Sequence, residues 1–348
     1  MEQELTTPGP LLLPNGELAQ VGWARQPVLD CNLERAAFYP WLLRGWQRLR
    51  VKRWDYYALF TPQRFFSATV ADLGYAANVF VYTLDWQTKT LHEEGLVLPS
   101  GAVKLPRNST EGETVYMSRK ARLIFQAETG VRRVQVEWPG FDGGKGISAN
   151  LEMVCPPEHE SMNIVIPIRE RRFYYNRKIN CMPATGVLVY GDVREQVDPR
   201  QSLASLDWGR GVWEYRSYWN WASASGFLAD GRAVGLNLGR GFGDTTQASE
   251  NALVLDGKVH KLGAVRFDYI SGKYMEPWRF GDDRPGRKQI DLTFTPFKER
   301  VARSNMLVIF SEVHQMFGQY SGCVVADDGE EIHIDGLVGF AEEHHARW

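Results

Sequence analysis

The segment DWGRGVWEYRSYWNWASAS (207–225) carries the densest group of side chains in this chain that could bind or transform a ligand. Four Trp and two Tyr fall within these nineteen positions, interleaved with charged and amide side chains. If the segment is one extended strand, alternate side chains share a face, with Trp213, Tyr215, Ser217, Trp219 and Trp221 on one face and Glu214, Arg216, Tyr218 and Asn220 on the other. We therefore expect a strand between two environments, with its charged face in the interior of a polar pocket.

Glu214 is the candidate acid or base of this segment. A Glu beside an Arg is held ionised, whereas apolar surroundings raise its pKa until it can act as an acid. The alternative is that the Trp side chains belong to the core while Glu214, Arg216 and Asn220 meet solvent. Both interpretations stay open, because a narrow barrel is filled by side chains and a wider one leaves a ligand cavity.

Two further segments hold candidate functional groups. In NRKINCMPATG (176–186), Asn176, Lys178 and Asn180 share parity, and amides with a cation would orient a carbonyl, a carboxylate or a sugar hydroxyl. A charged face on an edge strand is the alternative. The Gly-rich segment 241–258 contains Glu250 and Asn251. The overlapping GRGFGD pattern at 239–244 lacks the phosphate-binding spacing and is more typical of a turn.

His314 lies among apolar residues in the middle of an expected strand, where it is either a hydrogen-bonded core side chain or a general base. We predict Glu214, Glu250 and His314 as catalytic residues. The predicted ligand contacts are Asn176, Lys178, Asn180, Trp208, Arg210, Trp213, Arg216, Trp219, Asn220, Trp221 and Asn251.

Several kinds of chemistry lack a signature here. His344 and His345 are adjacent, so on a strand they face opposite sides and are a poor metal pair; we predict no metal site. The GxSxG nucleophile motif is absent. No nicotinamide, flavin, haem or pyridoxal pattern is visible, so we expect no cofactor. A carbohydrate site remains possible, because Glu214, Asp244, Glu250, Glu276 and Glu312 could supply paired carboxylates and Trp rings stack on sugars.

Composition limits the partners and the compartment. The 348-residue chain has a net charge of −2, which gives no basic field for nucleic acid or an anionic membrane surface. The N-terminal MEQELTTPGPLLL lacks the pattern of a signal peptide, and no window has the uninterrupted apolar length of a membrane-spanning helix. The four Cys are scattered without a CxxC motif, as in proteins with reduced thiols. We expect a cytoplasmic protein and leave its oligomeric state open.

Strand patterns dominate the chain, so we expect strands to position the candidate functional side chains. Alternating β-branched and aromatic segments recur between Gly and Pro residues, with a hairpin turn expected at 128–130, and they favour a sandwich or barrel. Helical patterning is scarce: the best candidate is 33–50, where Pro40 would break or kink the helix, and a helical turn is expected within 197–207. We expect an N-terminal β-rich domain over 1–158 and a C-terminal one over 159–348 that carries the Trp-rich segment; a boundary within 193–207 is the alternative.

Five motifs resemble the bacterial family called domain of unknown function 2804: GWARQP (22–27), NRKINCMPATG (176–186), the segment 207–225, SENALVLDGKVHKL (249–262) and the tail 319–348. The strand order and the central Trp-rich segment are also similar to calycin-like double-barrel proteins such as the carotenoid hydratases, tocopherol cyclases and fungal pericyclases. That resemblance implies an all-β fold with minor α, in which two calycin/lipocalin-like antiparallel β-barrels or sandwiches pack together around a hydrophobic small molecule. It carries no catalytic residue over to this chain.

Three functions follow as hypotheses. The first is a cofactor-independent hydratase, isomerase or cyclase acting on a hydrophobic, lipid-like or isoprenoid-like, or partly polar substrate, with Glu214 or Glu250 moving the proton. The second is a non-catalytic carrier of such a ligand, and the third is a carbohydrate-active enzyme or binder. We rank the first above the second because burying so many ionisable groups beside a purely apolar ligand is unfavourable unless they pair.

Overall fold

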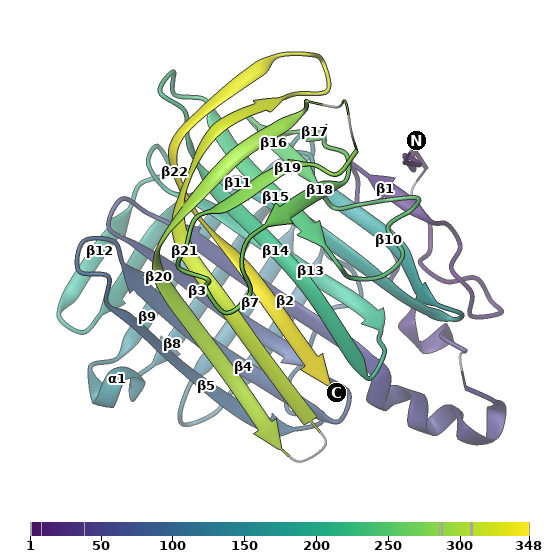
Figure 1. Cartoon of the computed structure of the whole chain (residues 1–348). Coiled ribbons are helices and arrows are strands. Elements are labelled where there is room, and N and C mark those ends of the chain that lie inside the picture. The colour runs from purple at the N-terminus through teal and green to yellow at the C-terminus, as the bar shows by residue number, and fades with distance from the viewer. Residues whose placement is uncertain are drawn as a thin grey trace.

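The computed structural model shows a chain built almost entirely from antiparallel β-strands in two curled sheets, which confirms the predicted all-β class (Figure 1). It describes residues 2–7, 9–37, 39–284, 286, 288–306 and 309–347. The short helical elements are η1 (Leu33–Arg35), η2 (Trp41–Arg50) and α1 (Phe141–Gly144). Across the described ranges, none of these is long and apolar enough to cross a bilayer.

The first sheet takes its strands from the N-terminal three-fifths of the chain. These are β1 (Gly22–Ala24), β2 (Val51–Phe60), β3 (Arg64–Asp72), β4 (Ala76–Asp85), β5 (Leu91–Pro99), β6 (Gly112–Met117), β7 (Arg122–Glu128), β8 (Gly130–Trp138), β9 (Ile147–Cys155), β10 (Met162–Arg169), β11 (Arg172–Tyr190), β12 (Val193–Val197) and β13 (Leu203–Val212). Their main order is β5-β4-β3-β2-β13-β11-β9-β8-β7-β6. The expected turn at 128–130 joins β7 to β8.

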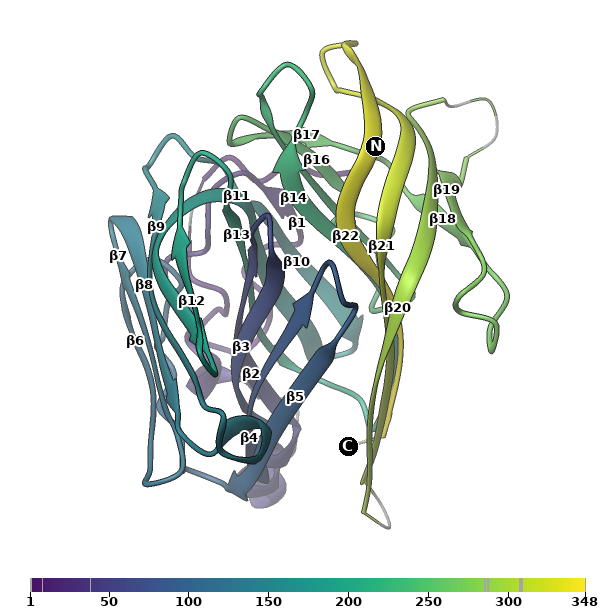
Figure 2. The same ribbon diagram turned by 90° about the vertical axis from the view of Figure 1, so that its left-hand side faces the viewer.

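The second sheet takes its strands from the remaining part of the chain. These are β14 (Arg216–Phe227), β15 (Ala233–Arg240), β16 (Ala252–Leu255), β17 (Lys258–Lys261), β18 (Val265–Asp268), β19 (Trp278–Asp282), β20 (Ile290–Met306), β21 (Ile309–Val325) and β22 (Glu331–Arg347). Their order is β17-β16-β15-β14-β22-β21-β20-β19-β18. The long strands β20 to β22 stand opposite β4 and β5 of the first sheet (Figure 2).

Two local expectations are corrected by this arrangement. The segment 207–225 is not one strand, because β13 ends at Val212 in the first sheet and β14 begins at Arg216 in the second. The helix expected over 33–50 is two separate 3₁₀ helices, with Pro40 directly before the second. Strands β10 to β13 belong to the first sheet, and the chain passes to the second sheet at 213–215.

Strand β13 lies between two buried layers of the protein. All ten of its residues are buried, because one of its faces meets the core of the first sheet and the other faces the second sheet. Such a strand loses the apolar–polar alternation of a half-exposed strand. Phe65 of β3 and Phe317 of β21 pack with ring centroids 4.9 Å apart, and they join the two sheets directly.

Candidate functional site

A cavity of about 390 Å³ lies between the two sheets. One wall comes from β2, β3, β4, β5, β11 and β13, and the other comes from β14, β20, β21 and β22. Aromatic rings form much of the lining: Trp54, Tyr174, Trp213, Trp219, Trp221 and Phe242. Trp213 packs edge to face on Trp54 at 5.2 Å and on Trp219 at 5.5 Å between centroids. These contacts hold the rings in place, and the result is a largely apolar space with a few polar groups.

Glu342 of β22 is a carboxyl group buried in this wall, with 6% of its surface exposed. Nε1 of Trp219 donates a hydrogen bond to its Oε1 at 3.2 Å, and Nε2 of Gln315 donates to its Oε2 at 3.1 Å. Burial raises the pKa of Glu342 to about 7, against the opposing effects of the Trp219 hydrogen bond and the charge of Arg300. Glu342 therefore keeps its proton over the range below neutrality and can donate it to a bound molecule.

A chain of hydrogen bonds continues from Glu342 across the cavity to the first sheet. Gln315 accepts a hydrogen bond from the hydroxyl of Tyr82 at 3.0 Å, and that hydroxyl lies 2.9 Å from the hydroxyl of Tyr56. Arg300 of β20 lies over the ring of Tyr82 at 4.2 Å. These groups fix the orientation of Gln315 and so of the Glu342 carboxyl group.

A second polar group, built around Lys178 of β11, lies in the same cavity. Its Nζ is 2.9 Å from Oδ2 of Asp207 and 3.6 Å from Oε2 of Glu250, and it stands 3.8 Å from the ring centroid of Trp221. Nδ2 of Asn176 donates to Asp207 at 2.5 Å. One buried ammonium thus stands between two carboxylates and above an aromatic face, which stabilises its charge.

Strand alternation separates the functional side chains from their sequence neighbours. On β22, Glu342 and His344 line the cavity, whereas Glu343 points to the other face of the second sheet and accepts hydrogen bonds from Tyr269 and Tyr274. Burial, with the charges of Arg300 and His345, lowers the pKa of His344 to about 3. His344 is therefore neutral near neutral pH, and its Nε2 lies 2.9 Å from the Ser311 hydroxyl.

The structure brings part of the predicted set together. The predicted residues that line the cavity are Lys178, Trp213, Trp219, Trp221 and Glu250, and Asn176 contacts the cavity residue Asp207. They come from both sheets and from the loop before β16, so the segments at 176–186, 207–225 and 241–258 do converge on one place.

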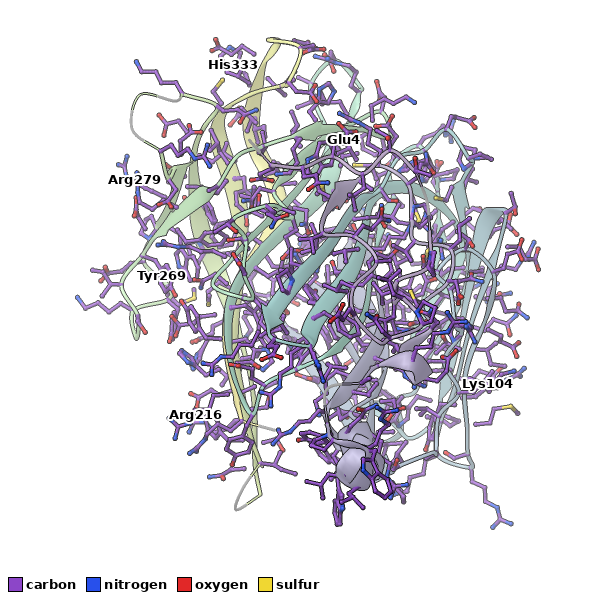
Figure 3. All side chains as sticks on the ribbon, turned by 90° about the vertical axis from the view of Figure 1, so that its right-hand side faces the viewer. Glu4, Lys104, Arg216, Tyr269, Arg279 and His333 are labelled. Carbon is purple, nitrogen blue, oxygen red and sulfur yellow. The ribbon has the colours of Figure 1, made fainter. Side chains whose placement is uncertain are left out.

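Three predicted residues lie elsewhere, against our expectation of a charged face turned into the pocket. Glu214, in the link between the sheets, pairs with Arg169 and with Arg172 at 3.7 Å. Arg216 is exposed and projects outward at the edge of the molecule (Figure 3). His314 lies between two carboxylates outside the cavity lining, and it faces away because Gln315 takes the inward position on β21.

The remaining predicted contacts are buried in other layers. Nδ2 of Asn220 donates to the Tyr269 hydroxyl at 2.9 Å on the far face of β14, and Asn180 donates to Ser223 at 3.1 Å. Oδ1 of Asn251 accepts from the backbone of Gly239 at 2.7 Å. Arg210 lies over Trp208 at 3.5 Å and pairs with Asp55, which places both residues inside the first sheet. Alternation turns Asn220, Trp208 and Arg210 away from the cavity. Asn180 shares the face of Lys178 but lies farther along β11, against Ser223 of β14.

Sequence reasoning missed the groups that complete the cavity. Glu342 was not among the predicted functional residues, and Tyr56, Tyr82, Arg300 and Gln315 lie in segments with no local signal beyond a strand pattern. Two other clusters, Cys323–Glu331–His333 and His260–Asp327–Asp328, have metal-ligating spacing among the described residues, and neither lines the cavity.

Comparison with known proteins identifies the fold but no activity. The model of the family described as a domain of unknown function (DUF2804) matches residues 2–348. No curated protein matches the chain. The crystal structure of CghA with Sch210972 is 14% identical, covers 85% of this chain and 88% of its own, and superposes with a TM-score of 0.54.

A second structure of CghA gives a TM-score of 0.53 at the same identity and coverage. Kievitone hydratase from Nectria haematococca is 12% identical over 85% of this chain and 88% of its own, with a TM-score of 0.48. The two CghA superpositions show that this chain shares the fold of CghA over most of its length.

Proposed function

Because the chain belongs to the DUF2804 family, whose description assigns no activity, we propose a function from the geometry of its cavity. The protein is a cofactor-independent hydratase, isomerase or cyclase that acts by proton transfer on a largely apolar small molecule held between the two sheets. The observation that carries the proposal is the buried carboxyl group of Glu342, which faces an aromatic cavity and has a pKa of about 7.

Each polar group has a role in this scheme. Glu342 donates its proton to an alkene carbon or a carbonyl oxygen of the substrate, and the aromatic rings of the cavity lining stabilise the positive charge that develops. Asp207 and Glu250, which share the ammonium of Lys178, are the carboxylates that accept a proton from carbon or from water. One proton is donated to the substrate and one is taken from the substrate or from water, so the reaction needs no oxidant or reductant.

The neighbouring structures give limited support. CghA was crystallised with a bound small molecule, Sch210972, and superposes over most of this chain, so the fold is one that can hold such a ligand. At 14% identity the likeness extends to the fold alone. The substrate class proposed here rests on the lining of the cavity in this chain.

Glu342→Gln is the variant that tests the proposal. The full chain is incubated with a bacterial lipid extract, and mass spectrometry follows components that gain or lose water or convert to an isomer. We expect wild-type turnover to fall as pH rises above about 7, where Glu342 ionises, and to fall about 100-fold or more in Glu342→Gln.

Glu343→Gln is the matched control, because Glu343 is the adjacent carboxyl group on the opposite face of β22. It should keep wild-type turnover if it remains folded. Full activity in Glu342→Gln would remove Glu342 from the mechanism. A chemically unaltered lipid that stays bound, with no turnover of any component, would instead establish the carrier function.

A further inference from the structure

Two buried guanidinium groups lie together at one end of the first sheet. Arg177 of β11 and Arg132 of β8 are 5% and 4% exposed. Asn176 and Lys178, the neighbours of Arg177, serve the cavity between the sheets, and alternation turns Arg177 the opposite way. This pair is therefore separate from the site described above and does not depend on the proposed function.

All hydrogen-bond acceptors of the pair are neutral. The Ser109 carbonyl accepts from Arg177 at 3.1 Å and from Arg132 at 2.6 Å. The Ser161 hydroxyl accepts from Arg177 at 3.0 Å, and the Tyr57 hydroxyl lies 3.5 Å from Arg132. Among the residues described, neither guanidinium forms an ion pair, and Nε of Arg132 has no hydrogen-bond partner.

Other buried arginines of this chain have a carboxylate as counter-charge. Three of them each pair with a carboxylate: Arg64 with Glu195 at 3.1 Å, Arg210 with Asp55 at 2.9 Å and Arg300 with Glu93 at 2.6 Å. A buried cation without a counter-charge is strongly unfavourable, and two adjacent cations are more so. Burial and the charge of Arg132 lower the pKa of Arg177 to about 10, whereas the pKa of Arg132 is raised because the Tyr57 and Cys155 side chains outweigh the effect of burial.

A pocket of about 230 Å³ gives access to the pair. Its lining includes both arginines, Cys155 and Gly130. Glu128 is the carboxylate among the described lining residues, and it is exposed and pairs outward with Arg133 at 3.0 Å. The pocket therefore presents positive charge at its buried end and no negative charge there.

We propose that this pocket binds the oxyanion group of a small molecule, a carboxylate or a phosphate, between Arg132 and Arg177. Guanidinium groups match such anions because their N–H groups donate in a planar fork. The anion supplies the counter-charge that the described residues do not, and its binding stabilises the folded chain.

Thermal unfolding of the full chain tests the site with two probes, inorganic phosphate and acetate, each titrated at constant ionic strength. We expect at least one of them to raise the unfolding midpoint saturably, by roughly 3–8 °C. Saturation by phosphate alone assigns a phosphoryl ligand, and saturation by acetate alone assigns a carboxylate ligand. The rise should be absent in Arg177→Gln and retained in Arg133→Gln, whose side chain lies on the outer face. A rise of equal size in Arg177→Gln, or no saturable rise with either probe, overturns the proposal.

A second measurement needs no variant, because the Cys155 thiol lies close enough to interact with both guanidinium groups. The rates of Cys155 alkylation by anionic iodoacetate and neutral iodoacetamide are compared by peptide mass spectrometry. The iodoacetate-to-iodoacetamide ratio should be several-fold higher in the folded chain than in the urea-unfolded chain. Two outcomes contradict the site. The first is an equal ratio in the folded and the unfolded chain. The second is a folded chain in which neither reagent alkylates Cys155 and neither phosphate nor acetate raises the unfolding midpoint.

Discussion

Glu342 and Glu343 are adjacent on β22, and their pKa values shift in opposite directions because their side chains lie on opposite faces of the sheet. Both carboxyl groups are buried in β22, yet one faces the cavity and the other faces two tyrosine hydroxyls. For Glu342 burial dominates, and the pKa rises to about 7. For Glu343 burial also acts to raise the pKa, but hydrogen bonds from Tyr269, Tyr274 and His345 lower it overall. The same residue type is thus an acid on one face and an ionised acceptor on the other.

A pH-dependent stability follows from the Glu342 pKa. The folded chain keeps a proton that the unfolded chain releases between the ordinary value of 4.5 and about 7. Glu342 should therefore lower the free energy of unfolding by about 3 kcal/mol as pH rises through this window, whereas the lowered pKa of His344 acts in the opposite direction below its ordinary value of 6.5. Urea unfolding of the wild type and of Glu342→Gln at several pH values isolates the Glu342 contribution, because the wild-type slope should be the more negative of the two.

Glu343→Gln is the control, because a carboxyl group with a lowered pKa changes stability at pH values below its ordinary pKa. Its slope between pH 4.5 and 7 should remain that of the wild type. A Glu342→Gln chain whose slope also equals that of the wild type would show that Glu342 is ionised throughout.

At the scale of the element, β13 can be buried on both faces because it carries glycine where the neighbouring strand places a large ring. Gly209 pairs with Trp54 of β2, and a Cβ at Gly209 would lie 1.9 Å from the Trp54 ring. That ring cannot move aside freely, because it packs on Tyr174 and Trp213 in the cavity wall. The glycine therefore helps to set the shape of the cavity.

Gly209→Ala should lower the free energy of unfolding by about 1–3 kcal/mol, since the added methyl group overpacks this contact. The displaced Trp54 should also change the tryptophan fluorescence of the folded chain. Gly45→Ala is the control, because a Cβ there meets no atom within 4 Å. Its effect on stability should stay within about 0.5 kcal/mol. Equal effects of the two substitutions would contradict the close packing at Gly209.

At the scale of the whole molecule, polar bridges join the two sheets across the cavity. Arg300 of β20 pairs with Glu93 of β5 at 2.6 Å, and Gln315 of β21 accepts from Tyr82 of β4 at 3.0 Å. Figure 2 shows that these strands belong to facing sheets. Because Arg300 is buried, its loss would leave Glu93 without its counter-charge in a partly buried position.

Arg300→Gln should therefore lower the free energy of unfolding by about 2–3 kcal/mol. The same substitution at Arg303, which lies on the same strand and pairs with Glu312 at the surface, should change it by less than about 0.5 kcal/mol. Urea unfolding of the two variants under identical conditions makes the comparison. A change at Arg303 as large as that at Arg300 would show that the pair does not hold the sheets together.

Local patterns in the sequence were sufficient for the fold class, and they pointed to several residues that the structure brings to the cavity. Alternating strands, scattered glycines and the motifs at 176–186 and 207–225 predicted an all-β protein with its aromatic residues near a ligand, because these signals arise within a few residues. Three residues of these motifs, Lys178, Trp219 and Trp221, line the cavity between the sheets.

Only the tertiary structure decided which face of each strand meets the cavity. The link at 213–215 sends β14 into the second sheet, so Glu214 and Arg216 fall outside while Glu342, from the far end of the chain, falls inside. A periodicity of two residues says which side chains share a face, but the neighbour of that face is set by contacts between distant strands. For this reason the acid of the cavity had no signal of its own in the sequence.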